Sequence, residues 1–294
     1  MIRIIAFLVG MGFASVALIS LFAGIGPAFS TLSEEGKFVA PTAEHEFHES
    51  PKEVSFKHDG LGGNWDLAQL QRGYQVYREV CSSCHSMKFV AYRDLAQLGY
   101  NEAEVKALAA ENQVPGIDPD TGEAIMRPGR PTDNFPSPYP NKVAAAAANN
   151  NAVPPDLSLM TKARTDGTAY VYSLLTGYND STTYEKDGKS LKAEFPEFST
   201  PAGLHFNPYF ANLNLAMAAP LTTTGQVTYA DGTDASIDQM AQDVAAFMTW
   251  TAEPSLIERK RTGWPVLGFL LFATILAYFS KKQIWAATKP KKAK

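Results

Sequence analysis

The sequence predicts a mainly α-helical fold with long proline-rich loops and one C-terminal transmembrane helix. Two stretches, residues 67–81 and 237–251, have the apolar spacing of helices. Nine prolines between residues 113 and 157 disfavour regular elements there. An uncharged apolar run from Trp264 to Phe279 supplies the membrane segment.

Composition and charge favour one exported, acidic domain. The chain has 294 residues, 45% of them hydrophobic, which is enough for one main globular domain. All 30 acidic residues lie between Glu34 and Glu258, whereas seven of the 26 basic residues lie outside this stretch, so the remaining 19 leave a charge of −11. Such a domain disfavours nucleic acid and favours a cationic partner attracted electrostatically. A merely solubilising acidic surface is the alternative.

Residues 1–30 are predicted to be a signal peptide or an uncleaved N-terminal anchor. The stretch from Ile4 to Gly26 follows Arg3 and contains no charged residue. It is longer than the usual signal-peptide core of about 7–15 residues, but its small residues would suit a cleavage site. Both interpretations stay open.

Residues 261–282 are predicted to form the transmembrane helix, and residues 283–294 a cytoplasmic basic tail. The apolar run of 16 residues is short for a span, but Trp264 and Trp285 can lie at the two membrane interfaces. The six lysines that follow the run argue against a buried core helix. By the positive-inside rule the tail is cytoplasmic, so residues 31–260 form the exported domain.

Within this domain, two helices have recognisable starts. The helix over Leu67–Cys81 has Asn64 or Asp66 available as its N-terminal cap. A short helix over Asn101–Ala110 begins with a capping box that pairs Asn101 with Glu104.

The rest of the domain divides into loops and two further helices. Residues 113–157 are expected to be mostly loop around the alanine run Ala144–Ala148. A short helix is expected over Tyr170–Thr176, and the segment from Ser181 to Tyr209 is expected to be irregular. The last soluble helix has a continuous apolar stripe over Ile237–Thr251, and Asp234 or Ser236 can cap its start.

The motif that carries the chemistry is Cys81-Ser-Ser-Cys84-His85, which contains the only two cysteines of the chain. Cys-x-x-Cys-His is the attachment pattern of c-type haem. On a helical turn, positions i, i+3 and i+4 share one face, so two thiols can form thioethers with haem while the imidazole binds iron. The motif therefore predicts one covalent haem c, attached through Cys81 and Cys84, and a c-type cytochrome core.

Three other uses of two cysteines explain the pattern less well. A structural zinc site needs four ligands, which the scattered histidines do not complete. A thioredoxin-like redox pair would follow a strand, whereas a helix precedes this motif. A disulfide between cysteines three residues apart would close almost no loop.

The second axial ligand separates an electron carrier from a haem that binds small molecules. Met126, Met160 and Met217 remain as candidates after excluding methionines in the leader, beside His85 or in the last helix. Met217 lies in a small-residue loop where the chain could fold back over the haem. Four histidines are expected to be ordinary surface or loop residues: His45, His48, His58 and His205.

Several separated motifs resemble the cytochrome c1 family, the haem subunits of quinol–cytochrome c reductases. The resemblance covers most of the chain and rests on Cys81–His85, Ala148–Ser158, Tyr170–Tyr178, Phe206–Phe210, Met217–Pro220 and Ala252–Pro254. The family commonly has Gly-Ala-Leu where this chain has Asn-Ala-Val, and residues 181–204 match no part of the family pattern. The chain also has no cysteine left for the extra disulfide of some bacterial relatives.

The resemblance implies roles for individual residues. Met217 would be the sixth iron ligand beside His85, and Arg164 would bind a haem propionate, with Arg127 as a weaker competitor. The residues implied to line the haem are Asn149, Ala152, Pro155, Met160, Tyr170, Leu174, Leu175, Phe210 and Pro220.

The resemblance also implies a function and partners. The haem would accept single electrons from a Rieske iron-sulfur protein and pass them to a c-type cytochrome, while the C-terminal helix packs on cytochrome b within a dimeric complex. The domain would lie on the periplasmic side of a bacterial cytoplasmic membrane. A haem sensor or a peroxidase would instead need an open sixth position, which carbon monoxide binding would reveal.

Overall fold

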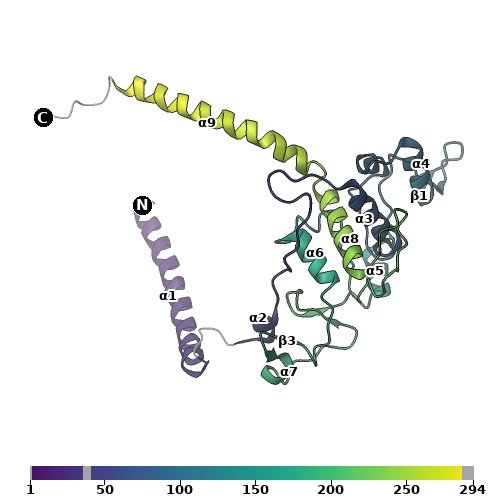
Figure 1. Cartoon of the computed structure of the whole chain (residues 1–294). Coiled ribbons are helices and arrows are strands. Elements are labelled where there is room, and N and C mark those ends of the chain that lie inside the picture. The colour runs from purple at the N-terminus through teal and green to yellow at the C-terminus, as the bar shows by residue number, and fades with distance from the viewer. Residues whose placement is uncertain (1, 36–40, 287–294) are drawn as a thin grey trace.

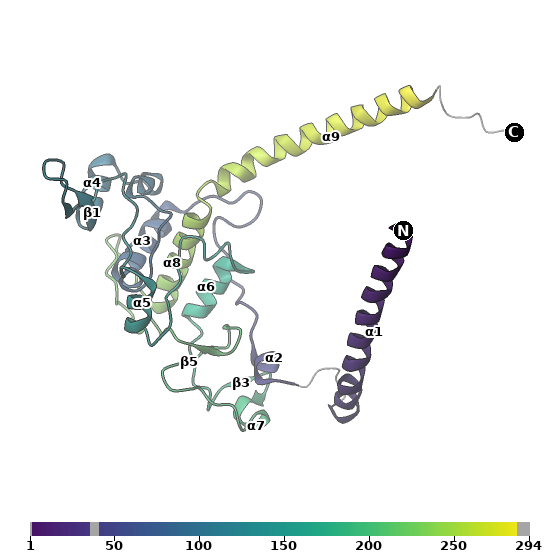
Figure 2. The ribbon, with the colours of Figure 1, turned by 180° about the vertical axis from the view of Figure 1, so that it is seen from behind.

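The computed structural model describes residues 2–35 and 41–286, with side chains described for residues 6–25 and 41–286. Along the chain, a folded domain follows the long helix α1 (Ile2–Glu35) and precedes the long helix α9 (Leu256–Ala286). Helix α9 projects from the domain in both views (Figures 1 and 2). The prediction of a mainly helical fold is confirmed.

Two crossed helices, α3 (Leu67–Glu79) and α8 (Ile237–Ala252), form the centre of the domain. Both begin with the caps that the sequence offered: Asp66 accepts from the backbone N–H of Gln69, and Ser236 from that of Gln239. The helices approach closely at Gly73, where a Cβ atom would lie 2.1 Å from the carbonyl oxygen of Asp243. A glycine is therefore required at this crossing.

Aromatic side chains fill the space around this crossing. Tyr77 stacks on Phe135 with ring centroids 5.9 Å apart, and Phe247 stacks on Trp250 at 5.7 Å. The third helix of the core, α6 (Gly167–Leu175), packs against α8. These contacts bury the apolar faces that the periodicity predicted.

A helical corner and a hairpin follow the motif region. The corner contains the 3-10 helix η2 (Tyr92–Leu98) and helix α4 (Glu102–Ala110), whose capping box between Asn101 and Glu104 is present as expected. Strands β1 (Gln113–Ile117) and β2 (Ala124–Pro128) then pair antiparallel.

The expectation of loop from residue 113 onward is wrong for this hairpin. Pro115 and Pro128 are tolerated because each strand of a two-stranded sheet has a free edge. The alanine run does form a helix, α5 (Lys142–Ala148), which Asn141 caps.

The segment from Ser181 to Tyr209 is more ordered than expected. It contains strands β3 (Glu185–Lys186) and β4 (Lys189–Ser190), helix α7 (Leu191–Glu194), and β5 (His205–Phe206), which pairs with β6 (Asn214–Leu215). Leu191 and Phe206 bury with Phe47 of the short helix α2 (Ala43–Phe47) in a second small core. The unmatched segment therefore folds against the beginning of the domain.

His58 lies in a loop, which is one of the two expected alternatives, but it is not on the surface. His58 is only 4% exposed because its ring lies between those of Phe56 and Trp65. Burial lowers its pKa, opposed by Asp59 and assisted by Lys260. His45, His48 and His205 are exposed, as expected.

Two described helices are long and apolar enough to cross a membrane. Their apolar windows have mean hydropathies of 2.2 in Ala6–Ile25 of α1 and 1.7 in α9, and neither window is buried in the protein. The predicted span from Trp264 to Phe279 lies inside α9, whose 31 residues extend about 47 Å. Most of the basic tail, residues 287–294, and the side chain of Arg3 lie outside the described residues.

Candidate functional site

The two cysteines lie directly after α3, where the chain continues into the 3-10 helix η1 (Cys81–Ser83). The N–H of His85 donates to the carbonyl oxygen of Cys81 at 2.9 Å, so residues 81–85 complete a helical turn. Both thiols are free. Burial raises the pKa of Cys81 to about 12, which makes it a neutral thiol unlike the low-pKa thiolate of a redox-active pair.

The imidazole of His85 is oriented by a distant loop. Its Nδ1 lies 2.8 Å from the carbonyl oxygen of Pro155, and since a carbonyl can only accept, Nδ1 carries the proton. Burial lowers the pKa of His85, although the bond to Pro155 and the charge of Asp156 oppose this shift. The ring is therefore neutral at pH 7, with its Nε2 lone pair available for a metal.

Further hydrogen bonds fix the Pro155 loop to the motif. Asp156 accepts from the Ser86 hydroxyl at 2.8 Å and from the Lys88 N–H at 2.9 Å, and the N–H of Leu157 donates to the carbonyl oxygen of Ser86. Burial raises the pKa of Asp156, but the hydrogen bonds that it accepts outweigh this effect and leave the pKa below its ordinary value. Asp156 is thus an ionised clamp between the two segments.

The expected lining residues divide into two groups around the aromatic core. Cys81, Met160, Tyr170 and Leu175 lie half-buried against this core. Asn149 and Ala152 form the turn that follows α5, where the N–H of Ala152 donates to the carbonyl oxygen of Asn149.

The second group is attached to the C-terminal end of α6. The side-chain amide of Asn207 donates to the carbonyl oxygen of Leu174 at 2.8 Å. The N–H of Phe210 donates to the backbone carbonyl oxygen of Asn207. The Tyr178 hydroxyl donates to the carbonyl oxygen of Met217 at 3.0 Å. The Met217 loop is therefore fastened to the segment that follows α6.

The other ligand candidates lie in different surroundings. Met126 is 60% exposed on β2 of the hairpin, and Met160 is half-buried beside Leu157. Pro220 lies at the end of the Met217 loop, and its carbonyl accepts from the side-chain amide of Gln226.

The two candidate arginines differ as well. Arg164 is exposed, and the hydrogen bond described for its guanidinium goes to the adjacent carbonyl of Ala163. The guanidinium of Arg127 is committed to both carboxylate oxygens of Asp133. The geometry thus leaves Arg164 as the more available cation.

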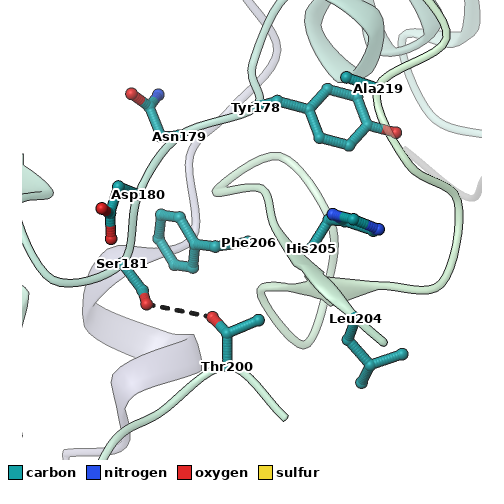
Figure 3. A pocket seen from close by; sticks show the side chains of 9 residues that line it. All are labelled: Tyr178, Asn179, Asp180, Ser181, Thr200, Leu204, His205, Phe206 and Ala219. Carbon is teal, nitrogen blue, oxygen red and sulfur yellow. Dashed lines mark hydrogen bonds between the residues drawn. The ribbon is translucent and has the colours of Figure 1, made fainter. Parts of the chain in front are cut away.

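An open depression of about 580 Å³ lies beside the Met217 loop (Figure 3). In Figure 3 the ring of Tyr178 lies next to Ala219 and above His205, while Phe206 lies beside Asp180 and Ser181. The thiols and His85 do not line it. Among residues 41–286 no three histidine, cysteine, aspartate or glutamate side chains gather as a metal site.

Sequence reasoning missed the positioning residues Asp156 and Tyr178. Both occur inside motifs that carry the family resemblance, but the search for iron ligands considered only histidine and methionine, so it did not single them out. Asn207, which is fully buried in the Phe-Asn-Pro-Tyr-Phe motif, was missed for the same reason.

Comparisons with known proteins agree with the motif. The profile of the Cytochrome C1 family matches residues 56–288. Cytochrome c1 of Rhodospirillum rubrum is 46% identical over 78% of this chain and 85% of its own. Cytochrome c1-2, a mitochondrial heme protein of Solanum tuberosum, is 44% identical over 86% of this chain and 91% of its own. Cytochrome b/c1 of Bradyrhizobium diazoefficiens is 39% identical over 94% of this chain and 40% of its own.

Proposed function

The chain belongs to the cytochrome c1 family, and from this membership we propose that it is the electron-transfer subunit of a quinol–cytochrome c reductase, carrying one covalent haem c. When bound, the haem accepts and releases one electron at its iron. The observation that carries the proposal is the turn of residues 81–85, which places two free thiols beside an imidazole whose Nδ1 is already occupied.

The donor set of this turn fits haem c. Cys81 and Cys84 would form the two thioethers, and His85 would bind iron through Nε2. The hydrogen bond to Pro155 keeps the imidazole in the tautomer that this requires and increases its basicity as a ligand. The Asp156 clamp holds the loop that supplies the Pro155 carbonyl.

Met217 is proposed as the second axial ligand. Its loop is fastened through Tyr178, and thioether ligation opposite histidine raises the reduction potential. Arg164 is proposed to pair with a haem propionate, since a guanidinium binds a carboxylate with charge-assisted hydrogen bonds. The remaining lining residues exclude water from the iron: Asn149, Ala152, Pro155, Met160, Tyr170, Leu174, Leu175, Phe210 and Pro220.

The proposed partners follow from the family and from the charge of the domain. This subunit would take electrons from a Rieske iron-sulfur protein and pass them to a c-type cytochrome, whose basic surface would be attracted to the acidic domain. We assign α9 as the membrane anchor that packs on cytochrome b, an association that the name of the Bradyrhizobium relative supports. Residues 31–260 would then be periplasmic in a bacterial cytoplasmic membrane, within a dimeric complex, with α1 as signal peptide or second anchor.

The test is the optical spectrum of the Met217→Leu variant of the purified complex. We expect the weak far-red band of methionine bound to ferric iron to disappear and the reduced haem to gain carbon monoxide binding. Met126→Leu and Met160→Leu are matched controls, and both should keep the band. An unchanged spectrum in Met217→Leu would move the ligand elsewhere, and carbon monoxide binding by the wild type would favour a haem sensor.

A further inference from the structure

The loop from Phe56 to Asn64, before α3, has a rigid base. The N–H of Phe56 donates to the Asp59 carboxylate at 2.7 Å, and the N–H of Asn64 donates to the carbonyl oxygen of Lys57 at 2.8 Å. Beneath the loop, the buried ring of His58 lies between two aromatic rings. The loop therefore holds its tip in a defined position.

The tip displays one large apolar side chain. Leu61 is 70% exposed and is flanked by Gly60 and Gly62. Gly60 has a φ of +64°, the left-handed conformation that favours glycine and turns the chain sharply at this point. The tip thus offers one apolar side chain, whose transfer from water to an apolar environment would be favourable.

This loop is bound to the first turns of α9. The Lys260 ammonium donates to the carbonyl oxygens of His58 at 2.8 Å and Gly60 at 2.7 Å, and Arg261 donates to the Asn64 side chain. Trp264 follows Lys260 by one helical turn, which is about 6 Å along the axis. Leu61 is therefore fixed close to the level at which the apolar part of α9 begins.

We propose that the Gly60–Gly63 tip is a second membrane contact, in which Leu61 enters the interface of the lipid bilayer beside α9. The inference rests on the proposed function of α9 as the membrane anchor. The exposed Leu61 would suit acyl chains, and the exposed Arg261, which donates to Asn64 of the same loop, would suit anionic headgroups. A contact that is bound to the first turns of α9 would hold the domain against the bilayer and so restrict the orientation of the haem.

The chain also contains a matched control for this contact. Ile117 is 72% exposed on β1, in a hairpin that lies away from α9 in both views (Figures 1 and 2). The adjoining turn carries Asp118, Asp120 and Glu123, which an anionic membrane would repel. Leu61 and Ile117 are thus about equally exposed in water, but only Leu61 is expected to contact a membrane.

Spin labels at single introduced cysteines test the proposal in the purified complex, reconstituted into vesicles of phosphatidylcholine and phosphatidylglycerol. The native cysteines are assigned to thioethers, so Leu61→Cys, Ile117→Cys and Leu270→Cys each add one reactive thiol to this subunit. The wild-type complex, labelled identically, gives the background of the other subunits. Collisions with oxygen, which concentrates in lipid, are compared with collisions with a water-soluble nickel chelate.

We expect the oxygen-to-nickel ratio at position 61 to exceed that at position 117 several-fold and to remain below that at position 270. A ratio at 61 equal to that at 117, with a lipid-exposed label at 270, would overturn the inference and leave the anchor intact. A label at 61 that neither reagent reaches would also overturn it, because another subunit would then cover the tip. A label at 270 in water would overturn both the anchor and the inference.

Discussion

The Nδ1 atom of His85 lies 2.8 Å from the carbonyl oxygen of Pro155, which is 70 residues further along the chain. This bond joins the haem-attachment motif to the loop of residues 154–158, so the orientation of the imidazole depends on how firmly that loop is held. Three hydrogen bonds to Asp156, from Ser86, Lys88 and Ser158, hold it in place. The loop is therefore the place where a change far from the motif in sequence would reach the iron ligand.

Asp156→Ala is expected to destabilise the domain and to shift the reduction potential of the haem. The variant loses its acceptor for three donors, and an unsatisfied donor that is at least partly buried costs about 1–3 kcal/mol. For a domain of this size each kcal/mol lowers the melting temperature by about 2–4 °C. Thermal melting and redox titration measure the two effects. Asp120→Ala, on the exposed hairpin turn, should change neither, and equal melting of the two variants would refute the clamp.

Gly73→Ala is expected to destabilise the domain strongly, because its Cβ would lie 2.1 Å from the carbonyl oxygen of Asp243 and 2.6 Å from the Cβ of Phe247. Overpacking of this kind costs about 1–3 kcal/mol, and more where backbone must move. The melting temperature measures the loss. Gly62→Ala is the matched control, since a Cβ there meets nothing within 4 Å. A Gly73→Ala protein as stable as Gly62→Ala would mean that α3 and α8 can separate at little cost.

The helices of the core were predictable because their signals are local. The apolar stripe of α8 and the caps at Asp66 and Ser236 act within one or two turns of chain. The β1–β2 hairpin was not predicted, although the turn Asp-Pro-Asp-Thr-Gly122 is rich in turn formers and Gly122 has a positive φ. The prolines in both strands led instead to the prediction of a loop. The burial of His58 depends on rings that only the folded chain brings together.

The candidate site was predictable where chemistry fixes the spacing and less so elsewhere. The motif at Cys81–His85 can be recognised from the sequence alone, because two thioethers and an axial imidazole need positions i, i+3 and i+4. Met217 was one of three methionines from the residues alone, and the family resemblance singled it out. The supporting roles of Asp156 and Tyr178 depend on contacts between segments distant in sequence, which spacing does not reveal.

Asp133→Asn is expected to lower stability at neutral pH but not in strong acid. Two hydrogen bonds from the Arg127 guanidinium, at 2.7 and 2.8 Å, lower the pKa of Asp133 to about 2. The ordinary value is about 4. Because the folded-state pKa is the lower one, the carboxylate stabilises the fold above about pH 4 and this contribution is lost as pH falls toward 2.

Urea-unfolding midpoints of the detergent-solubilised protein, measured across this range, check the expectation. The difference between wild type and Asp133→Asn should close between about pH 4 and 2. A difference that stays constant down to pH 2 would mean that the carboxylate does not titrate with a lowered pKa.

The reduction of a soluble, basic c-type cytochrome by the complex is expected to slow several-fold as salt rises. The −11 charge of the region between Glu34 and Glu258 would attract such an acceptor over distances beyond contact. At about 0.15 M ionic strength this attraction is already screened beyond about 8 Å. Stopped-flow rates at increasing sodium chloride measure the effect, and an acidic acceptor serves as control. A rate independent of salt would leave the acidic surface with a solubilising role only.

Tyr178→Phe is expected to loosen the Met217 loop without removing the proposed ligand. The hydroxyl donates to the carbonyl oxygen of Met217 at 3.0 Å, and burial raises its pKa, so it remains a neutral donor at pH 7. Loss of one such bond costs about 0.5–1.5 kcal/mol, which would favour dissociation of the thioether from iron roughly 2- to 10-fold. Carbon monoxide binding to the reduced haem measures that open fraction.

Tyr184→Phe is the matched control for this variant. Its hydroxyl donates to Glu49 at 2.9 Å and not to the Met217 loop, so its loss should leave the open fraction unchanged. If Tyr178→Phe binds carbon monoxide no better than Tyr184→Phe, the loop is held by its own packing and the tyrosine has no positioning role. If it binds more while keeping its far-red band, the hydroxyl acts on the equilibrium of the Met217 ligand, as the hydrogen bond implies.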